Sequence, residues 1–308
     1  MTGPRAAVDV GTNSVRLLVV DADGARLTRE LTITRLGQGV DATGRLDPAA
    51  LQRTVDAIAG YRAIWESHGV DRAVRIAATS AVRDASNRDA FFTGVRAVAG
   101  ADAEVLSGDE EAALAFAGAA GAVDVATPTA VIDVGGGSTE LVVGDEVGAV
   151  VGSVSLQLGC VRLTERHLHG DPATDDERRA AVAEIDARLD EADAALGRQG
   201  ASLGEVGSLI GVAGTATTLA ALHLGLDEYH EEAIHGTRIP TAALVALTED
   251  LVGRTSAQRA ALGPVQAGRE DVLHGGALVL AAVLQRYALA ELVVSEADGL
   301  DGAVASLG

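Results

Sequence analysis

The 308-residue sequence contains no lysine, one cysteine and only six prolines. The single cysteine, Cys160, excludes an internal disulfide and a cluster of thiolate metal ligands. Few prolines, no low-complexity run and an apolar content of 48% indicate a folded globular protein. Aromatic residues make up only 2% of the chain, and their scatter argues against a platform for stacking nucleic-acid bases.

Long apolar runs are also missing. No apolar stretch approaches the length needed to cross a bilayer, and the N-terminus lacks the charged-then-apolar pattern of a secretory signal. We therefore expect a cytoplasmic protein that does not bind membranes.

Basic residues are scarce relative to acidic ones. The chain carries 24 arginines against 44 aspartates and glutamates, which gives a net charge of −20. This balance argues against general nucleic-acid binding, which needs a broad positive surface. An anionic ligand must therefore be held locally. Arginine suits that task because its planar guanidinium can hold two phosphate oxygens. The absence of lysine itself is explained by a coding bias toward arginine.

Two stretches of the sequence resemble each other. VDVGTNSVRLLV (8–19) aligns with IDVGGGSTELVV (132–143) without a gap, so that Asp9 matches Asp133. A glycine turn between apolar, alternating flanks is typical of a β-hairpin. Because the aspartate precedes the turn in both copies, we infer an internal duplication in which each copy opens one domain.

Strand-like and helix-like segments alternate after each hairpin, which predicts α/β domains with sheets covered by helices. The tract VDVATP (123–128) is the expected connection between two domains. We predict an N-terminal domain over 1–122 and a C-terminal domain over 123–296. A final helix at about 297–308 is the candidate element to pack back on the first domain.

A glycine turn directly after a strand exposes consecutive backbone N–H groups that can bind an anion. The chain has three such turns, and hydroxyl and amide side chains in them add further donors. We predict that phosphate is bound by ten residues of these turns: Gly11, Thr12, Asn13, Ser14, Gly135, Gly136, Gly137, Ser138, Gly214 and Thr215.

Acidic residues beside these turns indicate a metal site. An aspartate at the end of an apolar strand is costly to bury unless it meets a cation. Asp133, and secondarily Asp9, are therefore candidate ligands of Mg²⁺ or Mn²⁺, and Glu140 is a third. Alternatively, each aspartate accepts the N–H groups of its own turn, and Glu140 faces solvent.

Six segments, taken in order, resemble the successive motifs of one known family, the exopolyphosphatase and guanosine pentaphosphate phosphatase (Ppx/GppA) family of the actin and sugar-kinase superfamily. They are VDVGTNSVRLLV, AATSAVRDASN (77–87), LSGDEEA (106–112), IDVGGGSTELVV, GVAGT (211–215) and SEADGLDGAV (295–304). The resemblance covers essentially the whole chain. It implies two ribonuclease-H-like, actin-like α/β domains with mixed sheets flanked by helices, an active site in the cleft between them, and Mg²⁺-dependent hydrolysis of a terminal phosphoanhydride bond.

The resemblance also implies roles for three residues. Glu111 matches the glutamate that activates the attacking water, and Arg83 is expected to reach a phosphate oxygen. Arg162, in LGCVRLTE, is a second candidate phosphate contact. Such a base suits phosphoanhydride hydrolysis, in which most of the barrier reduction comes from charge stabilisation. The neighbouring Asp109 and Glu110 are explained by the electrostatics of a helix N-terminus.

The expected activity is removal of the terminal phosphate of inorganic polyphosphate. Short chains should be preferred, because a long polyanion needs an extended basic track, whereas the net charge of this chain is −20. In addition, longer family members carry a C-terminal helical region that we do not recognise in this sequence. Hydrolysis of the 5′-terminal phosphate of guanosine pentaphosphate is the alternative within the same chemistry. An ATP-dependent kinase for a small metabolite and a non-catalytic phosphate-ligand sensor represent other classes. A homodimer stays open, and nucleic acid and membranes are not expected partners.

Overall fold

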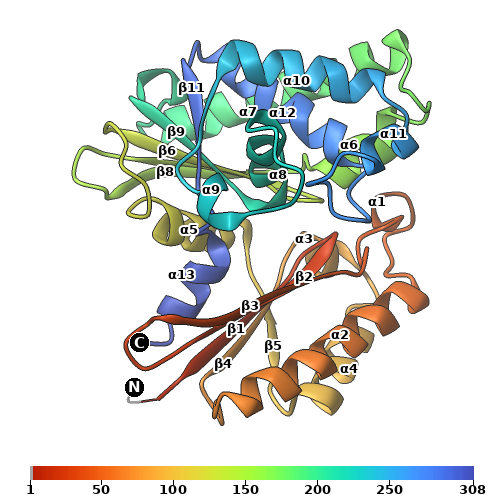
Figure 1. Ribbon diagram of the computed structural model, residues 1–308, viewed down its shortest axis with the longest axis vertical. Coiled ribbons are helices and arrows are strands. Elements are labelled where there is room, and N and C mark those ends of the chain that lie inside the picture. Colours follow the sequence, from red (N-terminus) through yellow and green to blue (C-terminus); the bar gives the residue numbers. More distant parts are fainter. Residues whose placement is uncertain (1–2) are drawn as a thin grey trace. The chain divides into compact units, whose positions relative to one another are not determined.

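A computed structural model describes residues 3–308, which divide into two compact units (Figure 1). Unit 1 consists of the residues up to Gly118 together with Gly299–Gly308, and unit 2 consists of Ala119–Asp298. The chain therefore passes from unit 1 to unit 2 once and returns near its C-terminal end. Between residues 3 and 308, no helix is both long enough and apolar enough to cross a membrane.

Unit 1 is built on a five-stranded mixed sheet with the order β3-β2-β1-β4-β5. The strands β1 (Arg5–Val10), β2 (Ser14–Val20) and β3 (Arg26–Ile33) form an antiparallel meander. The strands β4 (Val74–Ala78) and β5 (Ala103–Val105) continue the sheet parallel to β1. The carboxyl ends of β1, β4 and β5 consequently lie at one edge of the sheet.

Six helices belong to this unit: α1 (Val40–Thr43), α2 (Pro48–Ser67), α3 (Ser80–Asp84), α4 (Asp89–Ala99), α5 (Gly108–Ala119) and α13 (Gly299–Ala305). The start of α2 shows why the local sequence forms a helix there. The side chain of Asp47 accepts the N–H groups of Ala49 and Ala50, and Pro48 occupies the first helical position.

The two faces of this sheet have separate apolar cores, because successive residues of a strand point to opposite sides. Leu17 packs with Ile58 of α2 and Phe91 of α4. Leu18 faces the other side and packs with Leu300 of α13, which comes from the far end of the chain.

Unit 2 repeats this plan with a six-stranded sheet in the order β10-β11-β9-β6-β7-β8. Its strands are β6 (Thr129–Val134), β7 (Thr139–Gly144), β8 (Val150–Leu156), β9 (Ser208–Val212), β10 (Arg238–Pro240) and β11 (Glu291–Val294). As in unit 1, an antiparallel meander (β6-β7-β8) is followed by parallel strands, here β9 and β11. The carboxyl ends of β6, β9 and β11 share one edge.

The helices of unit 2 cover this sheet. They are α6 (Cys160–His167), α7 (Asp175–Arg198), α8 (Ala213–His223), α9 (Glu231–Ile234), α10 (Thr241–Gly253), α11 (Ser256–Ala260) and α12 (Leu273–Arg286). In the acidic α7 a stripe that includes Ile185 and Leu189 is buried, and Thr174 forms a capping box with Glu177. The predicted fold class, two α/β halves with mixed sheets flanked by helices, is confirmed.

The docking of α13 can be tested at Gly302, where a Cβ would lie 2.2 Å from the carbonyl oxygen of Leu114. We expect Gly302→Ala to displace α13 and to lower the free energy of unfolding by about 1–3 kcal/mol, measured by urea denaturation. Gly299→Ala is the matched control in the same helix, because its nearest neighbouring atom lies 3.7 Å from the added Cβ. Equal midpoints for Gly302→Ala and the wild type would show that this contact does not hold the helix.

Candidate functional site

The two duplicated glycine turns have the same backbone geometry. The N–H of Gly11 donates to the carbonyl of Ser14 at 2.9 Å, and the N–H of Gly135 donates to the carbonyl of Ser138 at 3.0 Å. A Cβ on either glycine would lie 3.2 Å from that carbonyl oxygen, so both turns are tight enough to favour glycine. This match supports the inferred duplication.

In unit 1 the carbonyl groups of the turn are bound by the segment 34–37. The carbonyl of Asn13 accepts the N–H groups of Thr34 and Arg35 at 3.0 and 2.9 Å, and that of Thr12 accepts the N–H of Gly37 at 2.8 Å. In a trans peptide the carbonyl and the following N–H point in opposite directions. The N–H groups of Asn13 and the next residue therefore point away from this segment.

In unit 2 the start of α6 binds the turn carbonyls in the same way. The N–H groups of Cys160 and Val161 donate to the carbonyls of Gly135 and Gly136, each at 2.9 Å. The Nε of Arg162 donates to the next carbonyl along, that of Gly137, at 2.7 Å. The N–H groups of residues 136–138 accordingly point away from α6, as an anion-binding turn requires.

Arg162 thus contacts the turn itself, and its direct contact with phosphate stays a prediction. Close approach of α6 depends on Gly159, where a Cβ would lie 2.4 Å from the carbonyl oxygen of Gly136. The predicted hydroxyl donors have little exposure, since Thr12, Ser138 and Thr215 are 6%, 1% and 5% exposed.

Two predicted catalytic residues meet within unit 1. Arg83 lies in α3, just after β4, and Glu111 lies in the first turn of α5, just after β5. The Nη1 of Arg83 donates to the carbonyl of Leu106 at 2.9 Å and lies 3.2 Å from Oε2 of Glu111. The side chains of Arg83 and Glu111 are 21% and 17% exposed, so the ion pair is partly accessible to a ligand.

The glycine turn of unit 1 is tied to the same edge of the sheet. The N–H of Thr79, at the end of β4, donates to the carbonyl of Val10 at 3.1 Å. The hydroxyl of Thr12 lies 2.8 Å from that of Ser80, the first residue of α3. The structure therefore brings the turn, Arg83 and Glu111 together at the carboxyl edge of β1, β4 and β5.

Glu110 has a different role from its neighbour Glu111. Its Oε2 accepts the N–H and the hydroxyl of Ser107, both at 2.8 Å, and the Ser107 hydroxyl accepts the Glu110 N–H at 3.2 Å. This reciprocal cap lowers the pKa of Glu110, chiefly through the backbone hydrogen bond from Ser107. Glu110 thus lies at the helix N-terminus, as expected, and caps the helix through hydrogen bonds with Ser107.

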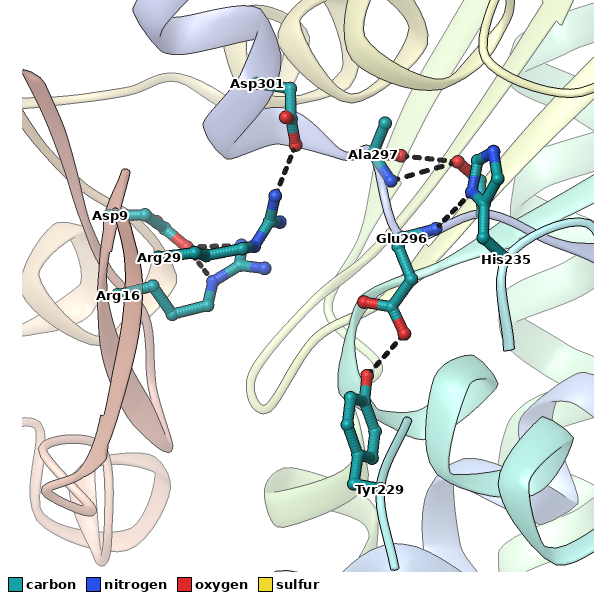
Figure 2. A network of polar contacts seen from close by, with 9 residues as sticks. Asp9, Arg16, Arg29, Tyr229, His235, Glu296, Ala297 and Asp301 are labelled. Atoms are coloured by element: carbon teal, nitrogen blue, oxygen red, sulfur yellow. Dashed lines mark hydrogen bonds and ion pairs between the residues drawn. The ribbon is translucent and has the colours of Figure 1, made fainter. Parts of the chain in front are cut away.

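Asp9 and Asp133 occupy equivalent places in the two hairpins but face opposite kinds of neighbour. Asp9 lies across from Arg16, whose Nη2 and Nε are 2.6 and 3.0 Å from Oδ2 of Asp9 (Figure 2). Asp133 lies across from Glu140, a second carboxylate. Glu140 is 1% exposed and accepts the Ser155 hydroxyl at 2.7 Å, so the alternative that it faces solvent is wrong.

The residues of unit 2 fit a hard divalent cation better than those of unit 1. Directly opposed carboxylates destabilise a sheet, and a cation between them removes the repulsion. Among residues 3–308, no group of three or more His, Cys, Asp or Glu residues is arranged to hold a metal. Two carboxylates nevertheless suit Mg²⁺, which keeps several waters and binds substrate phosphates. Asp9 already has the Arg16 guanidinium beside it.

The third glycine turn joins β9 to α8. The hydroxyl of Thr215 donates to the carbonyl of Val134 at 3.4 Å, which ties this turn to the end of β6. Arg269 lies directly on the turn, because a Cβ on Gly214 would be 1.3 Å from its Nη1. Sequence reasoning missed Arg269, since nothing in its spacing distinguished it from the other loop arginines.

Comparison with known proteins agrees with this geometry. The Ppx/GppA phosphatase family matches residues 18–304. The chain is 45% identical to Exopolyphosphatase 2 of Mycobacterium tuberculosis, with 98% of each chain covered. It is 30% identical to the bifunctional 3-dehydroquinate synthase/phosphatase of Fusobacterium nucleatum, with 97% of this chain and 46% of that protein covered.

Solved structures extend the match to the whole fold. A crystal structure of an exopolyphosphatase-like protein is 37% identical, with a TM-score of 0.93, and covers 99% of this chain and 98% of that chain. The PPX-GPPA enzyme of Aquifex aeolicus is 28% identical, with a TM-score of 0.81 and 99% of each chain covered. The fold and these relatives define a phosphatase and confirm that the chain is a hydrolase. It belongs to the Ppx/GppA phosphatase family, as its motifs predicted.

The packing of α6 on its turn can be tested through Cys160, the only cysteine of the chain. Burial raises the pKa of the Cys160 thiol to about 11, so the thiol is neutral at pH 8. We expect it to react with an aromatic disulfide reagent about a hundredfold more slowly in the native protein than in urea, because the thiolate is the reactive form. Equal rates would show that α6 does not pack on the turn.

Proposed function

We propose that the protein hydrolyses the terminal phosphoanhydride bond of inorganic polyphosphate with the help of Mg²⁺, and that it prefers short chains. The observation that carries this proposal is the pair formed by Arg83 and Glu111 at the sheet edge that also holds the Gly11–Ser14 turn. The relative in Mycobacterium tuberculosis named as an exopolyphosphatase adds support at 45% identity.

In this proposal Glu111 accepts a proton from the attacking water. Arg83 orients the carboxylate of Glu111. Aligning a base that is already held in one orientation requires less loss of entropy than aligning a mobile one. A guanidinium has five N–H donors, so Arg83 can keep its contact with Glu111 and also donate to a phosphate oxygen. The outward N–H groups of the glycine turns stabilise charge on the transferred phosphoryl group.

Asp133 and Glu140 would hold the metal, which supplies positive charge to the phosphate oxygens during transfer. Asp9 would instead use its contact with Arg16 to hold the first hairpin.

Polyphosphate of short length fits the charge of the chain. At a net charge of −20 the protein repels a long polyanion, and local contacts at the turns can hold only a few phosphates. Guanosine pentaphosphate is the alternative substrate. It is favoured by a Vibrio atlanticus relative named guanosine-5′-triphosphate,3′-diphosphate pyrophosphatase, which is 34% identical over 53% of this chain.

The deciding experiment measures phosphate release with Mg²⁺ from tripolyphosphate, long polyphosphate and guanosine pentaphosphate side by side. We expect the highest kcat/KM on tripolyphosphate. Highest activity on the nucleotide would select the alternative. Release of ADP from ATP only in the presence of a small metabolite would indicate a kinase, and binding without any release would indicate a sensor.

Glu111→Gln tests the base. We expect kcat on tripolyphosphate to fall by a factor of about 10²–10⁴ while substrate affinity, measured by calorimetry, stays close to the wild type. The control is Asp109→Asn, an exposed acid two residues earlier in α5, which should retain activity. A Glu111→Gln enzyme of normal kcat would remove Glu111 from the mechanism.

Asp133→Asn and Glu140→Gln test the metal site. Each should raise the Mg²⁺ concentration for half-maximal activity by about tenfold or more, and titration calorimetry should show weaker Mg²⁺ binding without substrate. Asp9→Asn should leave Mg²⁺ binding unchanged, although it costs the ion pair with Arg16. A larger effect at Asp9 than at Asp133 would contradict the assignment.

A further inference from the structure

One loop of unit 2 contacts both segments through which the chain passes between the units. We name residues 229–238 the clasp loop; this segment follows α8, contains α9 and ends at Arg238, the first residue of β10. The chain leaves unit 1 after Gly118 and returns to it at Gly299. The two connecting segments considered are residues 119–124 and residues 294–298, which both lie in unit 2.

His235 of the clasp loop bridges these two segments. Its Nε2 lies 2.9 Å from the carbonyl oxygen of Ala122, and its Nδ1 accepts the backbone N–H of Glu296 at 3.2 Å (Figure 2 shows the second contact). A carbonyl can only accept and an amide N–H can only donate. The partners therefore specify a neutral ring with its proton on Nε2.

Tyr229 holds the second segment at another point. Its hydroxyl donates to Oε1 of Glu296 at 2.6 Å, as Figure 2 shows. Burial, followed by the negative charge of Glu296, raises the pKa of the Tyr229 hydroxyl, which therefore stays protonated as a donor. Glu296 is thus held twice, through its backbone by His235 and through its side chain by Tyr229.

The far end of the clasp loop adds two more contacts. The Nη2 of Arg238 donates to the carbonyl of Asp124 at 2.8 Å, and the N–H of Gly236 donates to the carbonyl of Val294 at 2.8 Å. Ile234, directly before His235, is fully buried in the core of unit 2 and anchors the loop. The anchored loop therefore binds two residues of each connecting segment, Ala122 and Asp124 in the first and Val294 and Glu296 in the second.

The clasp loop also touches the helix that carries the third glycine turn. The side chain of Thr217 on α8 and the charge of the Arg269 guanidinium both act on Tyr229 and oppose the rise of its hydroxyl pKa. Arg269 in turn lies on Gly214 at the start of α8. Arg269 thus lies on the candidate phosphate-binding turn and also acts electrostatically on the tyrosine that binds Glu296.

We propose that the clasp loop is a positioning device that holds both connecting segments in one conformation and thereby sets how readily the two units move during turnover. Motions between domains are absorbed by a few residues at such connections. Binding both connections to one anchored loop reduces the conformational freedom of these segments. Tyr229 and His235 act through Glu296 and Ala122, not on substrate. The effect on turnover rests on the proposed function, but the conformational effect does not.

Hydrogen exchange measured by mass spectrometry on the intact protein tests the clasp. His235→Ala should speed amide exchange about fivefold in both segments, residues 119–124 and 294–298, because one net hydrogen bond to each is lost. Tyr229→Phe should speed exchange only in 294–298. His230→Ala is the matched control, since His230 begins α9 without a side-chain cap and should leave both segments unchanged.

Kinetics on tripolyphosphate provide the second readout. We expect kcat/KM to fall about three- to tenfold for His235→Ala and Tyr229→Phe at an unchanged Mg²⁺ dependence, and His235→Gln, which keeps a donor and an acceptor, to recover part of the loss. Unchanged exchange in both segments, or equal behaviour of His235→Ala and His230→Ala, would overturn the proposal. If the wild-type protein were inactive, the proposed function would be contradicted. The hydrogen-exchange measurement alone would then test the role of the clasp loop.

Discussion

The candidate site depends on the capture of turn carbonyls by neighbouring backbone. In each hairpin a separate segment donates N–H groups to the carbonyls of the glycine turn, residues 34–37 in unit 1 and the start of α6 in unit 2. Because the peptide is planar and trans, the N–H group that follows each bound carbonyl points away from the segment that binds it. Glycine is needed where the capturing segment approaches closely, as at Gly159. The proposed binding of phosphate thus depends on backbone geometry more than on charged side chains.

The duplication conserves this backbone while the side chains diverge. At one cross-strand position the first hairpin carries Arg16, which neutralises Asp9, and the second carries Glu140, which adds a charge to that of Asp133. The first pair has opposite charges, whereas the second places two carboxyl groups opposite each other, as the proposed metal site requires. One hairpin plan therefore carries an ion pair in unit 1 and two opposed carboxyl groups, the proposed metal ligands, in unit 2.

Much of the fold could be predicted from sequence because its determinants are local. Both hairpins, the Asp47 cap of α2 and the amphipathic α7 follow from residues a few positions apart. The motifs also placed Glu111 and Arg83 among the candidate residues, and the structure puts them in contact. The counter-ion of Asp9 could not be assigned from the pattern alone, since pairing across the hairpin decides which side chain lies opposite.

By itself, the sequence determined the family, the two-sheet α/β class, the glycine turns and the acidic residues beside them, because each depends on the order of neighbouring residues. Tertiary structure alone decided what joins distant segments. It placed Arg269 on Gly214, packed Leu300 of α13 with Leu18, and bound His235 to Ala122 and Glu296. These contacts span from tens of residues to nearly the whole chain, and no local periodicity records which side chain will meet which carbonyl once the sheets and helices have packed.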